Sequence, residues 1–443
     1  MSEFIFPQDP KPSPSWGVHD PHIFRDPVSK KYYLYCTHGK AYSSPDLIRW
    51  TALENVIPVP PQDVIDHTGS RDVWAPDLFY NGSEYRMYAS VSTFGSQNSA
   101  IFLAVSSSPE GPFEPRGTVL RTVNGDPCNA IDANVIADVK TGEQYMLYGS
   151  FWGGIYMLKL DPATGMPLGH PDGVLHRDAD AIHLAARPQE HDGAIEGAYM
   201  IYRPENAYYY LFVSYGSLNS DYNIRVGRSR EITGPFLDPD GKDLLAEGDR
   251  KGEVGHLLIA GYRFEGDRTG FMAPGHNSVL RDFDGSWYLV HHIRPHNFHH
   301  FQMSLLHVRR MFWSEDGWPV VSPEPYAGGY PQPVDLSMFC GEWDYMKFRP
   351  TIPQGLTTTV KLILKEDGTG MLADSIHAKW HTESSLASGC HDCTTLVLEY
   401  SGWKDRILLM PVWDQENKVP AIAGCGLDAE HRTVWIKQFF EDR

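Results

Sequence analysis

The sequence predicts an all-β chain: a five-bladed β-propeller followed by a small antiparallel β-barrel or sandwich domain. Strand-like runs of aromatic and β-branched residues, interrupted by Gly, Pro, Asn and Asp, dominate the chain, and no long helical periodicity is present. One local pattern also occurs five times: a polar residue heads a short apolar run, and a turn and an aromatic-rich strand follow. A repeat of this kind, built from short strands, indicates propeller blades.

The five blades can be placed in chain order from these repeats. Each apolar run and its aromatic strand occupy 19–24 and 32–35, 74–80 and 85–88, 131–136 and 145–148, 195–199 and 208–212, and 275–280 and 287–290. The polar heads are Asp20, Asp77, Asp132, Glu196 and His276, so they recur every 55 to 80 residues. Equivalent positions of successive blades meet at the propeller axis, which predicts that these heads cluster there.

The blade pattern stops in a Pro- and Gly-rich stretch at 322–333. We therefore expect two domains, a catalytic propeller over 1–333 and a β-barrel or sandwich over 334–443. Strand-like runs at 357–364, 394–400, 406–410 and 434–440 support the second domain, and no catalytic constellation stands out there. This domain would add a binding surface, cover one end of the propeller or only stabilise it.

Charge and hydropathy exclude several classes of partner. The chain has 443 residues and a net charge of −18, which argues against nucleic acid, because binding to phosphates needs Lys and Arg. No run of 18 apolar residues is present, so we expect no membrane span. The first residues lack the features of a signal peptide. The chain as written is therefore expected to be cytoplasmic, or secreted if a signal segment has been removed.

The six cysteines are few for a chain of this length, and only Cys390 and Cys393 lie close together. This pair could be half of a zinc site or a redox pair, but no second pair stands at zinc-ribbon spacing. Ordinary free thiols or one local disulfide are the alternatives that we favour.

The acidic heads suit proton transfer better than a metal cage. A calcium cage needs carboxylates at short alternating spacing, whereas these acids are 55 or more residues apart, each on its own strand. Rigid strands that hold separate carboxylates around one cleft suit glycoside hydrolysis. The aromatic residues Trp74, Phe94, Phe151 and Trp152 would offer flat faces to sugar rings. For Asp77, in Trp-Ala-Pro-Asp, a structural hydrogen-bonding role is an equal alternative.

Several motifs, in this order, resemble family 43 of the glycoside hydrolases, and more narrowly its endo-acting α-1,5-L-arabinanases. They are His19-Asp-Pro-His-Ile-Phe-Arg-Asp26, Trp74-Ala-Pro-Asp77, Ser92-Thr-Phe-Gly-Ser-Gln-Asn-Ser-Ala-Ile101, Asn129-Ala-Ile-Asp132, Tyr148-Gly-Ser-Phe-Trp-Gly-Gly154 and Ile195-Glu-Gly-Ala-Tyr199. The resemblance covers about residues 15–330, and a weaker one links the tail to the small β domain of some larger arabinanases. It implies a five-bladed propeller that hydrolyses arabinan with inversion.

The resemblance also implies roles for individual residues. Asp20 would be the general base, Glu196 the general acid and Asp132 the residue that raises the pKa of the acid and orients it. Trp74, Asp77, Phe94, Phe151, Trp152, Asn129 and Ser150 would line the substrate cleft, and His276 would hold a mostly water-coordinated metal ion, usually calcium.

One departure and three rival functions stay open. Where many arabinanases continue differently, this chain has His291-His-Ile-Arg-Pro295, so Arg294 would either bind substrate or be structural. The rivals of an endo-arabinanase are an exo-acting α-L-arabinofuranosidase, a β-xylosidase of the same fold and a propeller that only binds carbohydrate.

Overall fold

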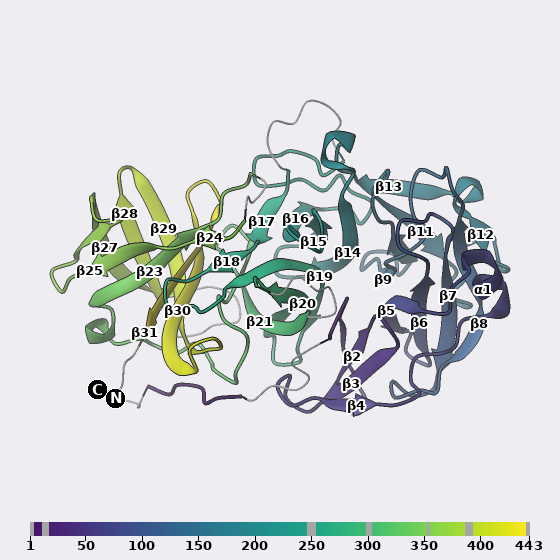
Figure 1. Cartoon of the computed structure of the whole chain (residues 1–443), viewed down its shortest axis with the longest axis horizontal. Coiled ribbons are helices and arrows are strands. Elements are labelled where there is room, and N and C mark those ends of the chain that lie inside the picture. Colours follow the sequence, from purple (N-terminus) through teal and green to yellow (C-terminus); the bar gives the residue numbers. More distant parts are fainter. Residues whose placement is uncertain are drawn as a thin grey trace.

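The computed structural model describes residues 4–10, 17–245, 254–297, 304–351, 355–385 and 393–439. Five sheets stand side by side in a ring, and the C-terminal residues form a separate closed barrel beside it (Figure 1). The predicted all-β chain, with a five-bladed propeller and a small antiparallel β domain, is confirmed. No helix among the described residues is long and apolar enough to cross a membrane.

Each blade is an antiparallel sheet of four strands, and three blades consist of these alone. Blade one contains β1 (His22–Arg25), β2 (Tyr32–Cys36), β3 (Lys40–Ser44) and β4 (Thr51–Leu53), and blade two contains β5 (Val73–Tyr80), β6 (Tyr85–Val91), β7 (Ser99–Ser106) and β8 (Glu114–Thr122). Blade three contains β9 (Asn134–Ala137), β10 (Gln144–Tyr148), β11 (Ile155–Leu160) and β13 (Ala181–Ala185), and blade four contains β14 (Ile195–Arg203), β15 (Tyr208–Tyr215), β16 (Asn223–Ser229) and β17 (His256–Ile259). Blade five contains β19 (Phe271–Arg281), β20 (Trp287–Pro295), β21 (Leu305–Trp313) and β22 (Pro319–Val321).

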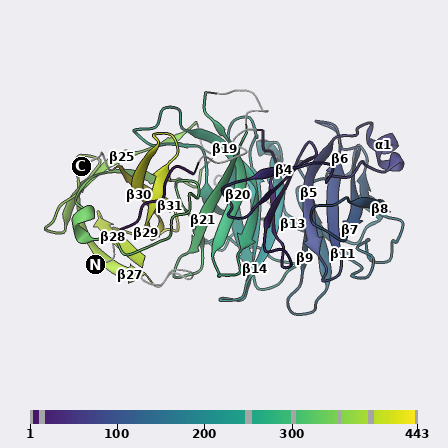
Figure 2. The same cartoon turned by 90° about the horizontal axis from the view of Figure 1, so that it is seen from below.

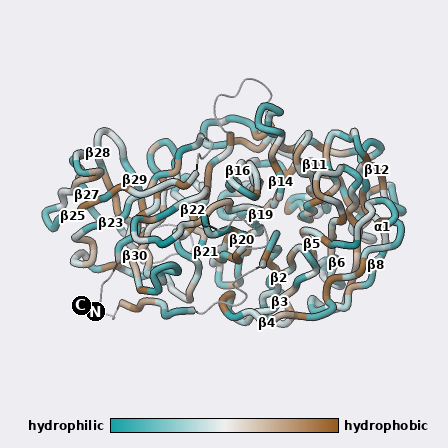
Figure 3. Tube along the Cα trace, viewed as in Figure 1, coloured by the Kyte–Doolittle hydropathy of each residue, from teal (hydrophilic) through white to brown (hydrophobic). Residues whose placement is uncertain are grey.

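Short elements complete the propeller. The strand β12 (Val174–Leu175) extends blade two in parallel, and β18 (Tyr262–Arg263) extends blade five. The helical turns are α1 (Gln62–Thr68), η1 (His176–Asp178), η2 (Gln189–His191) and, before the barrel, η4 (Leu336–Met338). Along the strands, hydrophobic and hydrophilic stretches alternate, as expected of sheets that pack face to face (Figure 3).

A backbone irregularity marks the start of the first strand in every blade. Asp20, Ala75, Asp132, Gly197 and His276 all have positive φ angles, between 38° and 61°. In blades two, four and five, pairing with the next strand also shifts register around this position, as in a β-bulge. The true equivalent of Asp20 in blade two is therefore Ala75, two residues before Asp77, and in blade four it is Gly197, one residue after Glu196. The expectation that all five heads share one position is wrong at these two blades.

Side chains of one blade bind the backbone of the next at this irregularity. The N–H groups of Ala75, Asp132 and His276 donate to the hydroxyls of Thr37, Ser90 and Ser214, which end the second strand of the preceding blade, and the N–H of Asp20 donates to His292 Nδ1. Blade four is the exception, because the Gly197 N–H donates to the Asp132 carboxylate. Positive φ costs energy for residues other than glycine, and these contacts help to offset that cost.

A second ring of contacts lies two residues further along each first strand. Asp77 is 2% exposed, and its carboxylate accepts hydrogen bonds from Asn134 Nδ2 and the Val135 N–H, both at 3.0 Å, and lies 3.0 Å from His22 Nδ1. Ser278 Oγ accepts from the Ile23 N–H at 3.0 Å, which joins blade five to blade one. These contacts make Asp77 a link between three blades, and they do not support the predicted place of Asp77 among the substrate-binding residues.

The C-terminal barrel is closed by eight antiparallel strands: β23 (Gly341–Lys347), β25 (Val360–Leu364), β26 (Thr369–Leu372), β27 (Ile376–Ser385), β28 (Cys393–Tyr400), β29 (Trp403–Asp414), β30 (Val419–Asp428) and β31 (Thr433–Phe439). The view from below shows it beside blade five (Figure 2). Cys393 is disulfide-bonded, which rules out zinc binding by this thiol, and Cys36, Cys128, Cys340 and Cys425 are free. Cys390 lies outside the described residues.

The barrel is docked on the propeller through a shared core. Trp313 and Trp318 of blade five belong to the same buried cluster as Met346, Phe348 and Trp435 of the barrel. A short strand, β24 (Thr357–Thr358), leaves the barrel between β23 and β25 and pairs in parallel with β18 of the propeller sheet. The two parts therefore share hydrophobic packing as well as backbone hydrogen bonds.

Candidate active site

The carboxylate of Asp20 stands at the axis, at the end of blade one. Thr37 Oγ1 donates to its Oδ2 at 2.5 Å, and His276 Nδ1 lies 3.2 Å from its Oδ1. Burial alone would raise the pKa of Asp20, but the surrounding imidazoles hold it well below its usual value. Burial lowers the pKa of His19 to about 4, so this ring is neutral near pH 7. Asp20 is therefore an ionised carboxylate that can accept a proton.

His276 is a basic group that interacts electrostatically with all three acids. Burial disfavours its charged form, but attraction to Asp20, Asp132 and Glu196 raises the pKa of His276 above its ordinary value. Three acids from blades one, three and four are thus brought around a ring from blade five. The convergence expected from the sequence is present, although the register of the repeat differed.

Asp132 and Glu196 form the second half of the site. Burial raises the pKa of Asp132 to about 7, with a further contribution from the Glu196 charge, while His276 opposes the shift. Burial also raises the pKa of Glu196, against hydrogen bonds from Ser150 and Tyr222. Two acids that repel each other in a desolvated site retain a proton between them near neutral pH. This half of the site can donate a proton while Asp20 accepts one.

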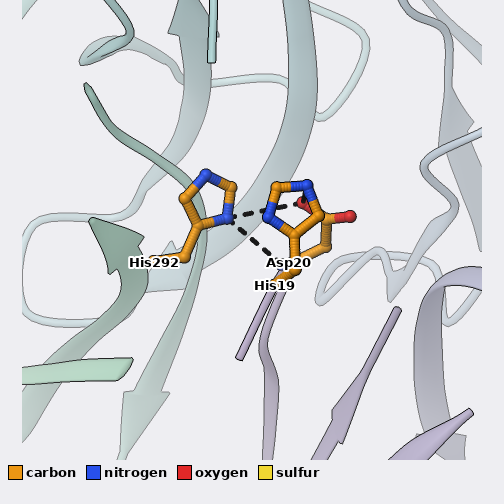
Figure 4. Close-up of side chains that lie close together, drawn as sticks. All are labelled: His19, Asp20 and His292. Atoms are coloured by element: carbon orange, nitrogen blue, oxygen red, sulfur yellow. Dashed lines mark hydrogen bonds and ion pairs between the residues drawn. The ribbon is translucent and has the colours of Figure 1, made fainter. Parts of the chain in front are cut away.

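Asp20 also lies beside His19 and His292, and these three residues could be considered as metal ligands (Figure 4). The rings of His19 and His292 stack, with centroids 4.3 Å apart. His19 Nε2 and His292 Nδ1 each lie 3.5 Å from Asp20 Oδ1. However, His292 Nδ1 accepts the Asp20 N–H at 3.2 Å, so its lone pair is already used. We interpret His19 and His292 as side chains that hold the Asp20 carboxylate in place.

Three of the four predicted aromatic residues lie on connections between strands, and the fourth, Trp74, lies in β5. Phe94, between β6 and β7, is 86% exposed, and Phe151 and Trp152, between β10 and β11, are partly buried. Trp74 is also partly buried, and its indole N–H donates to Asp72 at 2.8 Å, which fixes the plane of the ring. All four stay candidates for contact with sugar rings.

Three predicted polar residues lie beneath the carboxylates. Ser150 is 3% exposed and donates to Glu196 Oε2 at 2.6 Å, so its hydroxyl holds the acid. Asn129 is 5% exposed and directly precedes the turn that leads to Asp132. Arg294 is 2% exposed, and its charge interacts with Asp20 and Tyr222, which places it beside the base. A direct role in substrate binding stays a prediction for these residues.

Sequence reasoning missed Thr37 and Tyr222, which hold Asp20 and Glu196. A signal for Thr37 was available: Tyr35-Cys-Thr37, Tyr88-Ala-Ser90, Tyr148-Gly-Ser150 and Phe212-Val-Ser214 share an aromatic residue and, two residues later, a hydroxyl. In three cases the hydroxyl at this position accepts a backbone N–H of the next blade, whereas the hydroxyl of Ser150 donates to the side chain of Glu196 in the next blade. No comparable pattern marks Tyr222.

A five-bladed propeller with an ionised carboxylate facing a proton-sharing carboxyl pair at its axis defines a hydrolase of glycosidic bonds. Residues 11–319 match the model of glycosyl hydrolases family 43. The chain belongs to this family and is a glycoside hydrolase.

Individual relatives cover different shares of the chain. An extracellular endo-α-(1→5)-L-arabinanase of Thermotoga petrophila is 30% identical over 96% of this chain and 95% of its own. A crystal structure of endo-1,5-α-L-arabinanase from Thermotoga petrophila superimposes with a TM-score of 0.80, at 28% identity, over 99% of both chains. An extracellular exo-α-(1→5)-L-arabinofuranosidase of Cellvibrio japonicus is 32% identical but covers only 69% of this chain and 86% of its own.

Proposed function

We propose that this enzyme cleaves α-1,5-linked L-arabinofuranosyl chains at internal bonds and with inversion at the anomeric carbon. The observation that carries the proposal is the convergence of Asp20, Asp132 and Glu196 at the axis in two different protonation states. Similarity to an endo-arabinanase extends over both parts of the chain, whereas similarity to an exo-acting enzyme covers about two thirds of it. Arabinan and its oligosaccharides are accordingly the proposed substrates.

The protonation states give each carboxyl one role. Asp20 takes a proton from a water molecule, whose oxygen attacks the anomeric carbon. Glu196 gives its proton to the departing glycosidic oxygen as the C–O bond breaks. Asp132 keeps the pair protonated through mutual repulsion, and its Oδ2 accepts the Gly197 N–H at 3.2 Å, which fixes the backbone beside the acid.

Product analysis on linear arabinan tests this function. We expect a mixture of short oligosaccharides early in the reaction, and proton NMR should show that the newly formed reducing ends first appear as the β-anomer. Arabinose as the sole early product would indicate the exo-acting α-L-arabinofuranosidase, and hydrolysis of xylosides alone would indicate the β-xylosidase. An α-anomer as first product would contradict inversion.

We also propose a hydrated divalent cation, of the calcium class, beside His276. Three carboxylates surround one imidazole there, so the charge of the site favours a cation. The carboxylates lie on separate strands and form no closed cage, so water would complete the coordination. When bound, the ion would add positive charge at the axis. Chelator should lower the melting temperature of the wild type and added Ca²⁺ restore it, whereas His276→Ala should not respond. An unchanged melting temperature of the wild type would contradict the ion.

A further inference from the structure

Tyr222 lies on the connection between β15 and β16, directly beside the carboxyl of Glu196. Its hydroxyl donates to Glu196 Oε1 at 2.8 Å, while the hydroxyl of Ser150 donates to Oε2 at 2.6 Å. Both oxygens of the acid are therefore held by neutral hydroxyl groups, one from its own blade and one from the blade before. The side chain is 1% exposed, so packing determines where its hydroxyl points.

The ring of Tyr222 is tightly packed, so its orientation is fixed by its neighbours. It stacks on His292, with centroids 5.7 Å apart and planes at 21°. A Cβ atom on Gly275 would lie 1.9 Å from Cδ1 and 2.0 Å from Cε1 of the ring, which is far inside van der Waals contact. Position 275 must therefore be glycine for the ring to reach Glu196.

The barrel supplies part of the wall around this ring. Leu356, which directly precedes β24, packs with Leu218 against the small apolar cluster of Tyr222, Met272 and Ala273. The strand β24 is held on the propeller by its pairing with β18 and by the Thr357 N–H, which donates to Gly261 O at 2.8 Å. A side chain from the C-terminal part thus packs against the cluster to which Tyr222, the residue that holds the acid, belongs.

A second contact from the barrel reaches the same connection. The carbonyl of Pro350 accepts a hydrogen bond from Arg225 Nη2 at 2.8 Å, and Arg225 Nε donates to Asn223 Oδ1 at 2.9 Å. Asn223 in turn donates to the carbonyls of Tyr215 and Asp221, on both sides of the connection. The backbone that carries Tyr222 is therefore linked to the barrel by this chain of hydrogen bonds, in addition to the packing of Leu356 against its apolar cluster.

We infer that Tyr222 is a positioning residue for the general acid and that the barrel takes part in catalysis by buttressing it through Leu356. The inference rests on the proposed role of Glu196. As Glu196 gives up its proton, negative charge develops on its oxygens, and a hydroxyl already aimed at Oε1 stabilises that charge without rearrangement. The barrel then completes the site.

The tyrosine variant tests the acid directly. Tyr222→Phe keeps the ring and removes only the hydroxyl, so we expect kcat on arabino-oligosaccharides to fall about tenfold with KM changed less than about twofold. Hydrolysis of a dinitrophenyl arabinobioside, whose leaving group needs no proton, should fall less than about twofold. The control Tyr145→Phe, which removes a tyrosine–carboxylate hydrogen bond outside the site, should change neither rate. Equal losses on both substrates would overturn the inference.

The leucine variant tests the barrel. Leu356→Ala should lower kcat on the oligosaccharide about threefold and spare the dinitrophenyl substrate, with melting curves showing that the protein is folded. Val360→Ala, also a truncation to alanine but on a 43% exposed residue of β25, should leave kcat unchanged. An unchanged kcat in Leu356→Ala would overturn the role of the barrel. Wild type that fails to cleave arabinan would instead contradict the proposed function.

Discussion

Two buried clusters in this molecule each gather three carboxyl groups around one basic side chain, yet they differ in chemistry. At the axis, Asp20, Asp132 and Glu196 surround His276. At the junction of propeller and barrel, Lys437 lies 3.1 Å from Asp267, 3.0 Å from Glu324 and 2.7 Å from Asp414. Lys437 is fully buried and lies between the two parts of the chain.

The clusters differ in what satisfies the carboxyl groups. At the junction, one ammonium group donates to all three acids, so the charged pairs hold the barrel on the propeller. At the axis, the basic ring forms an ion pair with Asp20, and Glu196 receives hydrogen bonds from neutral hydroxyls. A buried acid without a cation retains its proton and can deliver it. Burial raises a carboxyl pKa to about 7 in both clusters, at Asp132 and at Glu324. The comparison therefore teaches that pairing with a cation, and not the pKa by itself, distinguishes the structural cluster from the reactive one.

Removing the acid at the axis should have the largest effect on rate. Glu196→Gln cannot donate a proton, so we expect kcat on arabinan to fall about a thousandfold. Because burial disfavours the charged form of Glu196, a neutral amide should leave the melting temperature unchanged or raise it. Steady-state hydrolysis and thermal unfolding measure the two effects. Glu110→Gln, at a half-exposed position, is the control, and a variant that kept a tenth of the rate would refute the acid.

Removing the Lys437 ammonium at the junction should have the opposite effect, a large loss of stability with little change in rate. Lys437→Met leaves three buried acids without their cation, so the free energy of unfolding at pH 7 should drop by about 3–5 kcal/mol. In the folded fraction, kcat should change less than about threefold. Lys361→Met breaks the exposed pair with Glu342 and should cost less than about 1 kcal/mol. Denaturant titration checks both, and a stable Lys437→Met variant would remove the basis of the comparison.

Asp77, which links blades one, two and three, is expected to have a smaller effect on stability than Lys437 and a smaller effect on rate than Glu196. Asp77→Asn would turn one oxygen into a donor that faces the N–H groups of Asn134 or Val135, or His22, so we expect about 1–3 kcal/mol less stability. The kcat should stay within about twofold, because the contacts of Asp77 are with other blades. A large rise in KM with unchanged stability would restore it as a substrate-binding residue. The exposed Asp240 supplies the control variant Asp240→Asn.

Asp77 also shows how far the sequence could be followed. The five blades were predictable because each repeats a polar head and an aromatic strand, and the barrel because its strands alternate. The register of the repeat in blades two and four was not predictable from the sequence. β-Bulges there displace the equivalent residue by one or two positions, and the spacing of the motifs does not reveal a bulge. Asp20, Asp132 and Glu196 were found through motifs, whereas Tyr222 and Leu356 depend on contacts between distant segments.

The smallest effect should come from the hydroxyl of Ser150, and its sign is informative. The hydrogen bond from Ser150 stabilises the ionised form of Glu196 and so lowers a pKa that burial raises. In Ser150→Ala the pKa should rise, so the alkaline limb of kcat/KM, above which the acid has lost its proton, should move to higher pH. The acid limb, set by Asp20, should stay, and the maximal rate should fall less than about tenfold.

Ser99→Ala is the matched control, since that buried hydroxyl contacts only Ser92, at 2.6 Å, among the described residues. An alkaline limb that moved to lower pH would mean that Ser150 stabilises the protonated acid. The carboxyl at the axis would then resemble Glu324 at the junction, whose pKa burial raises to about 7 even beside Lys437. Burial alone would in that case keep both protons in place, and the distinction between paired and unpaired acids would not explain which cluster is reactive.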